Sequence, residues 1–292
     1  MNKSVIDLKG VSKSFGDNPV LDNIDFSVPE GTIMGLIGKN GAGKTTMIKS
    51  MLGLIKPDKG TATVFNEDSW NLSAGSKQRI GYVPQVTTGF KWMKVNTLIE
   101  YTGAFYSHWS QQKVKSLVSE WELDPKAKVG NLSEGELQKL SIILAMGHEP
   151  DLYILDEPVA SLDPTARRQF IKHLIDMNIS ENKTMLFSTH ITSDLERVAA
   201  DIALLKNGKI SFIGDLDTLK DRIRRVHFQS DKDLPDPLPV DNIINSRINR
   251  TSATLTIDGL SDEEIQSIGT QLSAFVTVER LNLEEIFLEL NK

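Results

Sequence analysis

Two patterns of apolar positions run through the first 214 residues. Near the N-terminus, residues 5–8 and 20–28 carry apolar side chains at every second position, which predicts half-buried antiparallel strands. Other segments are continuously apolar, as expected of strands buried on both faces: residues 33–37, 152–155, 184–188 and 202–205. Helical patterns at 164–177 and 191–200 separate the later segments. Buried strands that alternate with helices predict an α/β protein with a parallel sheet, joined here to an antiparallel β subdomain.

The pattern changes again in two places. Residues 82–121 are mostly helical in pattern and rich in aromatic residues, which predicts an inserted helical subdomain at about 86–145. After Gly214 the segments become short and mixed, which predicts a small α+β domain over 215–292 beside a main domain over 1–214. Its expected elements are helices at 215–225, from 261 and at 283–290, and strands at 226–228, 253–257 and 275–278.

Composition and charge exclude several classes of function. The 292 residues include no cysteine, which excludes a disulfide scaffold, a thiolate zinc site, an iron–sulfur cluster and a cysteine nucleophile. The net charge of −6 falls entirely on residues 215–292, so we expect no nucleic-acid partner. Arg222, Arg224 and Arg225 are the one basic cluster, interpreted as a solvated helix end. The longest uncharged stretch, 265–278, is too short to span a bilayer, and no apolar run follows Lys3, so we expect no signal peptide.

A glycine-rich segment between a predicted strand and a predicted helix is the first candidate site. It reads Gly38, Lys39, Asn40, Gly41, Ala42, Gly43, Lys44, Thr45, which fits G-x-x-x-x-G-K-[ST], and Thr46 opens the helical run. Glycines let backbone N–H groups turn towards phosphates, and the helix start adds its positive end. This P-loop predicts that Lys44 reaches the β- and γ-phosphates of a nucleotide and that Thr45 ligates Mg²⁺.

Two carboxylates follow the buried run at 152–155. Asp156 and Glu157 stand at the carboxyl end of a predicted parallel strand, where α/β proteins bind ligands. Asp156 suits a magnesium ion, and Glu157 is placed to polarise an attacking water. The alternative is that this pair, with Pro158, only caps the next helix.

A second candidate anion site precedes the helical run at 137–146. It consists of Leu132, Ser133, Glu134, Gly135 and Glu136, and so combines a serine, a glycine and a helix N-terminus. The alternative is an ordinary serine cap followed by two acids in the first helical turn.

Together these segments resemble the ATP-binding subunit of an ABC transporter. The P-loop, Gln85, residues 132–136 and 152–157, Asp163 and His190 stand in that family's order and spacing, over about residues 4–214. The resemblance implies an ABC-type cassette that hydrolyses ATP with Mg²⁺, in a head-to-tail dimer with a second ATPase subunit, identical or different. It also implies a transmembrane permease as partner, and a peripheral location on the cytoplasmic face of the membrane.

The resemblance further implies roles for single residues. Phe15 would stack on adenine, and Gln85 would sense magnesium and the γ-phosphate. Ser133 and Gly135 would touch the γ-phosphate of the other subunit's ATP, in trans. Asp163 would communicate across the dimer, and His190 would hold the γ-phosphate and the attacking water. Gln85 and Asp156 would be ligands of the magnesium ion together with Thr45.

The second site departs from the family's usual Leu-Ser-Gly-Gly-Gln signature. Glu134 and Glu136 replace glycine and glutamine, whereas Ser133 and Gly135 are kept. Acids favour a helix N-terminus, but the same charge opposes a triphosphate that arrives there. We therefore expect ATP to bind in trans more weakly than in a typical member.

The C-terminal segment indicates which group of ABC transporter ATPases the chain resembles. A small α+β tail that ends in residues 282–290 is similar to the ending of ATPases paired with antibiotic, multidrug or peptide exporters. We expect a subunit that powers a separate permease, as an exporter. Two alternatives stay open: a soluble single-cassette ABC ATPase that acts without a permease, and an ATP-gated binding module with low turnover. The motifs do not indicate the transported substrate.

Overall fold

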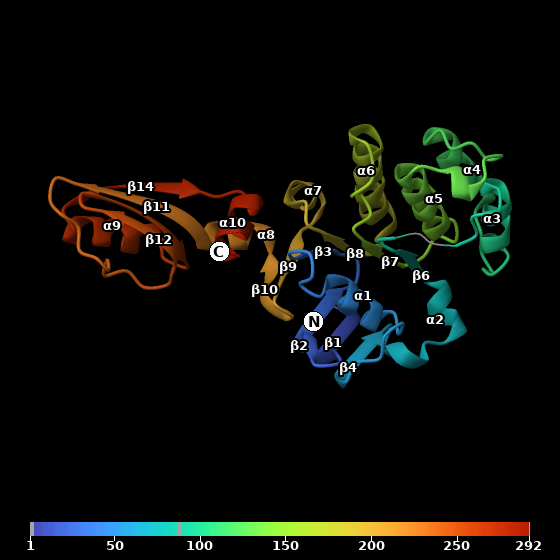
Figure 1. Cartoon of the computed structure of the whole chain (residues 1–292), viewed down its shortest axis with the longest axis horizontal. Helices are drawn as coiled ribbons and strands as arrows, with labels where there is room; N and C mark the ends of the chain where they lie inside the picture. The colour runs from blue at the N-terminus through green and yellow to red at the C-terminus, as the bar shows by residue number, and fades with distance from the viewer. Residues whose placement is uncertain (1–2, 87–88, 292) are drawn as a thin grey trace. The chain divides into compact units, whose positions relative to one another are not determined.

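A computed structural model describes residues 3–86 and 89–291. Its internal contacts divide the chain into unit 1, Met1–His190 with Arg197–Ile213, and unit 2, Ile191–Glu196 with Gly214–Lys292. Figure 1 colours the elements along the chain. The outer limits of the predicted domains, residues 1 and 292, and residues 87–88 of the predicted helical subdomain lie outside the described residues.

A six-stranded sheet forms the centre of unit 1, in the order β10-β9-β3-β8-β7-β6. The neighbouring strands from β9 to β6 are all parallel, so the carboxyl ends of β3, β8 and β7 share one edge of the sheet. These three strands are buried along their whole length, which confirms the prediction made from their continuous apolar runs. The strands are β3 (Ile33–Ile37), β6 (Ile80–Val83), β7 (Leu152–Asp156), β8 (Thr184–Thr189), β9 (Asp201–Lys206) and β10 (Lys209–Asp215).

A four-stranded antiparallel sheet lies beside it in unit 1. It comprises β1 (Ser4–Phe15), β2 (Asn18–Pro29), β4 (Lys59–Val64) and β5 (Glu67–Asp68), in the order β2-β1-β4-β5. β1 is longer than predicted because its register against β2 shifts after Leu8, which breaks the alternation of apolar side chains. One apolar core joins the two sheets, with Ile6, Ile24, Leu36 and Met47 among its fully buried members.

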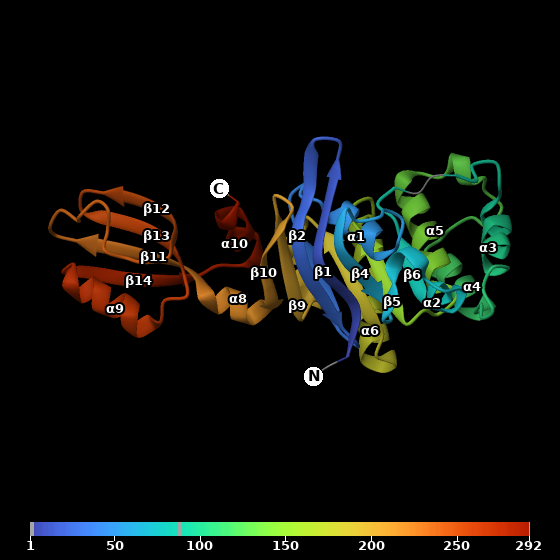
Figure 2. The ribbon, with the colours of Figure 1, turned by 90° about the horizontal axis from the view of Figure 1, so that it is seen from below.

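Helices surround the sheets of unit 1. They are α1 (Lys44–Met51), α2 (Ala74–Gln78), α3 (Val95–Gly103), α4 (Gln111–Glu120), α5 (Glu134–Met146) and α6 (Pro164–Glu181), with short 3₁₀ turns η1 (Ser69–Asn71) and η2 (Val129–Asn131). α7 (Thr192–Val198) follows β8. Both ribbon views show α3, α4 and α5 side by side (Figures 1 and 2). Trp121, after α4, is buried and packs edge-on against Phe170 of α6. Some of the aromatic residues in this region are therefore core residues.

Unit 2 contains an antiparallel sheet in the order β12-β13-β11-β14, with α9 packed against β14. Val226, Phe228, Leu255 and Ile265 lie in its core. Its elements are α8 (Leu216–Arg222), β11 (Ile223–Ser230), β12 (Ile243–Asn249), β13 (Ser252–Asp258), α9 (Asp262–Gln271), β14 (Ala274–Arg280) and α10 (Leu283–Leu290).

The basic cluster of unit 2 differs from the interpretation made from the sequence. The predicted helix at 215–225 ends at Arg222, and Arg224 and Arg225 belong to β11. Arg222 pairs with Asp258 at 2.8 Å, and Arg224 pairs with Asp262. The interpretation as a solvated helix end is therefore wrong, because cross-strand and helix-start carboxylates neutralise these guanidinium groups.

Candidate active site

A cavity of about 410 Å³ lies at the P-loop, between β3 and α1. Most of the predicted nucleotide residues line it, together with two that the sequence analysis missed, Asn18 and Val20. Those two stand at the start of β2, where no motif marks them. The lining residues are Phe15, Asn18, Val20, Lys39, Asn40, Gly41, Gly43, Lys44, Thr45, Thr46, Gln85 and Glu157.

The P-loop backbone requires glycine where it enters α1. Gly43 is the N-cap of α1 with φ of 108°, and a Cβ there would lie 2.9 Å from the carbonyl oxygen of Val20. Lys44 is buried and donates from Nζ to the carbonyl oxygen of Gly38 at 2.7 Å. Gly38 and Ala42, predicted with the P-loop, do not line the cavity, but this bond shows how Gly38 orients Lys44. The loop thus holds a lysine at a helix start, where anions are stabilised.

A buried carboxylate connects Lys44 to His190. Glu157 is 3% exposed, and its Oε1 lies 3.1 Å from Lys44 Nζ. Its Oε2 lies 2.8 Å from His190 Nδ1 and also accepts the backbone N–H of His190 at 3.3 Å. Glu157 has φ of 52°, a left-handed conformation that is uncommon outside glycine and clusters at functional sites. Lys44 and His190, which were predicted from separate motifs, therefore both contact the carboxylate of Glu157.

Asp156, one residue earlier, is fully buried at the end of β7. Its Oδ1 accepts the hydroxyl of Ser188 at 2.8 Å, whereas its Oδ2 has no hydrogen-bond partner within the described part of the chain. The pKa of the nearby Tyr82 hydroxyl is raised to about 12, mainly by burial and to a smaller extent by the negative charge of Asp156. A buried carboxylate oxygen without a donor fits a hard cation such as Mg²⁺.

Ser188 is the positioning residue that the sequence analysis missed. Its hydroxyl donates to Asp156 and accepts the backbone N–H of Glu157 at 3.1 Å. The parallel register pairs Asp156 with Ser188, and His190 follows two residues later. Its place at a strand end just before His190 was the available signal.

The two other predicted metal residues also lie together. The Thr45 hydroxyl donates to Gln85 Oε1 at 3.4 Å, and both residues line the cavity. Over the described ranges, no three His, Asp or Glu side chains gather in a way that could hold a metal ion. A cation here would therefore depend on few protein ligands and on phosphate or water oxygens, as Mg²⁺ commonly does.

The predicted signature forms the N-terminus of α5. Ser133 caps the helix, and Glu136 Oε2 accepts both the backbone N–H of Ser133 at 2.8 Å and its hydroxyl at 2.7 Å. The Ser133 hydroxyl and then its backbone N–H lower the pKa of the Glu136 carboxyl below its usual value. Glu134 is exposed. Glu136 therefore engages the serine that was expected to contact a phosphate.

Neither the signature nor Asp163 lines the cavity of its own chain. Asp163 caps α6 by accepting the N–H groups of Thr165 at 2.9 Å and Ala166 at 3.0 Å. Lys139 of α5 lies 3.7 Å from Asp163. A Cβ on Gly135 would stand 2.8 Å from the carbonyl oxygen of Ser161.

A P-loop at the end of a buried parallel strand, with Asp156 and Glu157 at the same edge of the sheet, defines a P-loop nucleotide-binding protein. The ABC transporter family model matches residues 21–160. The chain is 35% identical over 209 residues to the Nod factor export ATP-binding protein I of Burkholderia lata, covering 70% of this chain and 68% of that protein. The chain belongs to the ATP-binding proteins of ABC transporters.

Solved structures agree with this assignment. An ATP-binding subunit of an ABC transporter superposes with a TM-score of 0.67 and 27% identity, over 73% of this chain and 90% of that one. The dimeric, post-hydrolysis ATP-binding cassette MJ0796 with ADP and Pi shares the fold, with a TM-score of 0.65 and 23% identity over 72% of this chain and 98% of that one. As a member of this family, the chain binds and hydrolyses ATP. Among the helices of the described residues, none has the length and apolar character needed to cross a membrane.

Proposed function

We propose that the chain is the ATPase subunit of an exporter and that it powers a separate permease through ATP-driven, head-to-tail dimerisation. It would be peripheral, at the cytoplasmic face of the membrane. Two observations support export: the resemblance of the C-terminal tail to exporter ATPases, and the 35% identity to a protein named for Nod factor export.

The separation of the signature from the P-loop cavity carries the proposal of a dimer. Ser133 and Gly135 begin α5, whereas the P-loop, Gln85 and Glu157 line the cavity. A phosphate bound at Lys44 therefore has no signature contact from its own chain, and a second subunit would supply one. The dimeric state of the similar cassette structure is consistent with this arrangement.

Several residues in and beside the cavity have a defined part in the proposed hydrolysis. The P-loop backbone and Lys44 bind the phosphates, which also draws Lys44 away from Glu157. Glu157 then accepts the proton of the attacking water, and His190, bonded to Glu157 through Nδ1, holds its carboxylate in place. Thr45, Gln85 and Asp156 would hold Mg²⁺, which would supply positive charge for the transferred γ-phosphate and the departing ADP.

Phe15 suits the proposed adenine contact. It ends β1 at the edge of the cavity, is 51% exposed, and has Lys13 Nζ 5.6 Å from its ring centre. An exposed ring beside a phosphate site can stack on a base, whereas the charge of Lys13 is paired with Asp58 at 2.7 Å.

The permease would dock on an aromatic patch of the helical region, which we define as Phe90, Trp92, Tyr101 and Phe105. Successive ring centres lie 5.9 Å (Phe90 to Trp92), 5.6 Å (Phe90 to Tyr101) and 5.1 Å (Tyr101 to Phe105) apart. Trp92 is 73% exposed and Phe105 is 65% exposed. Clustered exposed aromatic side chains are typical of interaction surfaces, whereas single ones are common on any surface.

Purification of the tagged chain from its native membrane tests the proposal. We expect a membrane-spanning permease to co-purify and ATP turnover to accompany the complex. Trp92→Ala should weaken co-purification, whereas Trp70→Ala is the matched control, because Trp70 is an exposed tryptophan on η1 outside the patch. Recovery with soluble partners alone would support the soluble ATPase, and ATP binding without turnover would support the binding module.

A further inference from the structure

The fold brings together two basic segments that lie far apart in the sequence. Residues 91–96 run antiparallel beside residues 125–130, and the backbone N–H of Val129 donates to the carbonyl oxygen of Met93 at 2.9 Å. The two segments carry four lysines and no aspartate or glutamate. All four lysines lie outside the helices, just before α3 and just before η2. We define this lysine cluster as Lys91, Lys94, Lys126 and Lys128.

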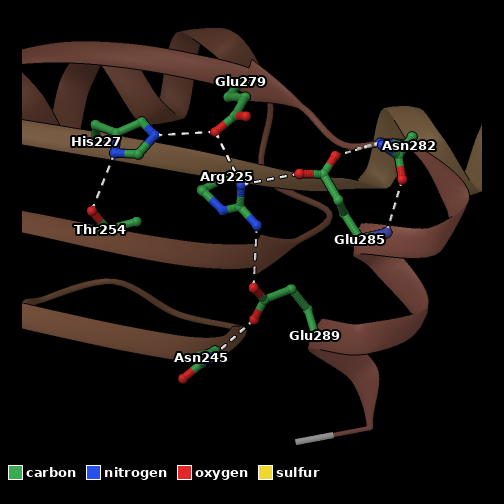
Figure 3. A network of polar contacts seen from close by, with 8 residues as sticks. All are labelled: Arg225, His227, Asn245, Thr254, Glu279, Asn282, Glu285 and Glu289. Atoms are coloured by element: carbon green, nitrogen blue, oxygen red, sulfur yellow. Dashed lines mark hydrogen bonds and ion pairs between the residues drawn. The ribbon is translucent and has the colours of Figure 1, made fainter.

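The lysine cluster is exposed and has no partner within the residues that the structure describes. All four side chains are exposed, and none of them takes part in an ion pair or a side-chain hydrogen bond with a described residue. The other basic cluster of the chain differs in this respect. There, Arg225 contacts three carboxylates, which belong to Glu279, Glu285 and Glu289 (Figure 3). The lysine cluster therefore presents positive charge that is available to a partner.

Two of the four lysines stand directly opposite each other. Lys94 and Lys128 form an isolated antiparallel bridge. Residues opposite each other in an antiparallel pair place their side chains close together, and like charges there are destabilising. Folding alone therefore gives no reason for two lysines at this bridge. Sequences break such local rules mainly at functional sites, and a negative charge from a partner would relieve this repulsion.

The aromatic patch defined above adjoins the lysine cluster. Lys91 stands between Phe90 and Trp92 in the chain, and the ring centres of these two residues lie 5.9 Å apart. Protein interfaces commonly combine an apolar, aromatic centre with a polar rim, and complementary charge across an interface gives specificity. The patch and the lysine cluster together fit a partner segment that carries both apolar and acidic side chains.

We propose that the permease segment that docks on the aromatic patch carries aspartate or glutamate side chains, which pair with the lysine cluster. This pairing rests on the permease docking proposed above. An anionic lipid surface is the alternative partner for exposed lysines. Lysines that bind lipid typically line an amphipathic helix or flank a membrane span, whereas all four lysines here lie outside the helices. The observations therefore favour an acidic protein segment.

Zero-length crosslinking in native membranes that contain the tagged full chain tests the pairing directly. A carbodiimide joins an amine to a carboxylate only where the two are in contact, and mass spectrometry then locates the joined residues. We expect crosslinks from Lys94 or Lys128 to an aspartate or glutamate of the permease. Lys9 and Lys59 are matched controls, because they are exposed lysines on the neighbouring strands β1 and β4, and they should give no such crosslink.

Reversal of one charge separates the pairing from folding. In Lys94→Glu, opposite charges replace like charges at the bridge with Lys128, so Tm should rise. Recovery of the permease with the tagged chain should nevertheless fall about 2- to 10-fold, because attraction to an acidic segment becomes repulsion. Lys59→Glu makes the same change of charge on β4 and should keep wild-type recovery. Recovery with the wild-type chain should also fall as salt rises.

The possible failures can be distinguished from one another. Equal recovery of the permease with the wild-type chain and with Lys94→Glu would overturn the pairing, and so would permease crosslinks confined to the control lysines. Binding of the purified chain to phosphatidylglycerol vesicles that is lost in Lys94→Glu, while recovery of the permease is unchanged, would assign the lysine cluster to lipid instead. Absence of any permease with the wild-type chain would refute the proposed function itself.

Discussion

Replacement of Glu136 by glutamine should strengthen the ATP-driven dimerisation of this chain. The Ser133 hydroxyl donates to Glu136 Oε2, so a γ-phosphate that reaches Ser133 brings its charge next to that carboxylate. Glutamine keeps the size of the side chain and one acceptor oxygen, and a Ser-x-x-Gln segment still forms a capping box. The variant therefore removes a charge while it preserves the start of α5.

The geometry of the cap sets the size of the effect. Glu136 Oε2 lies 2.7 Å from Ser133 Oγ. A phosphate oxygen that took over this single hydroxyl hydrogen from Glu136 would also lie about 2.7 Å from Oγ, so the two charges would lie no more than about 5.4 Å apart. Their repulsion is about 0.8 kcal/mol in bulk water and about 1.5 kcal/mol at a dielectric constant near 40. Because Glu136 is partly exposed, we expect about 1 kcal/mol for each site, roughly five-fold in affinity.

Sedimentation in the presence of ATP measures this change. The assay uses Glu157→Gln protein, with and without Glu136→Gln, at two salt concentrations, and the difference should shrink as salt rises. Glu134→Gln is the matched control, because Glu134 is exposed and the Ser133 cap is formed by Glu136 alone; its effect should be smaller. The full signature is restored by Glu134→Gly together with Glu136→Gln. Unchanged dimerisation with a lower Tm would refute repulsion and leave helix capping as the only role of the acids.

Two further substitutions test the cavity itself. Glu157→Gln keeps the shape but removes the proton acceptor, so ATP should still bind while phosphate release falls roughly 10²-fold or more; wild-type release would show that Glu157 is not the base. Lys44→Ala removes the phosphate-binding cation and leaves the buried Glu157 without its partner at 3.1 Å. Calorimetry should then show weaker ATP binding, with AMP binding less affected. The free energy of unfolding should also fall by about 1–3 kcal/mol. Unchanged ATP affinity would mean that the loop does not bind phosphate.

The parts of the fold that could be predicted are those with one strong constraint. β3, β7 and β8 are buried on both faces, so their sequences must be continuously apolar. β12 was missed because its two faces are mixed and its side chains are mostly half-exposed, so no alternation appears. The change from α8 to β11 at Ile223 was missed because charged residues continue through it, and the partners that favour a strand there lie far away in sequence.

The candidate site likewise contains residues that could be predicted from the sequence and one that could not. Lys44, Glu157 and His190 could be placed together from motif spacing, and the structure brings them into contact, while their catalytic roles stay predictions. Ser188 could not be given a role from the sequence, because its place at a strand end just before His190 does not by itself show which side chain it contacts. Its importance follows only from the register that puts it beside Asp156.

The close packing of Gly135 has a mechanical consequence. Its Cα side faces the carbonyl of Ser161 with no room for a Cβ, and Lys139 reaches Asp163 from the next turn of the same helix. We therefore expect the signature and the turn that ends at Asp163 to move together. In the proposed dimer, a partner subunit that contacts Asp163 would then displace Ser133 in the same movement, and the contact across the dimer and the contact with the partner's phosphate would change together.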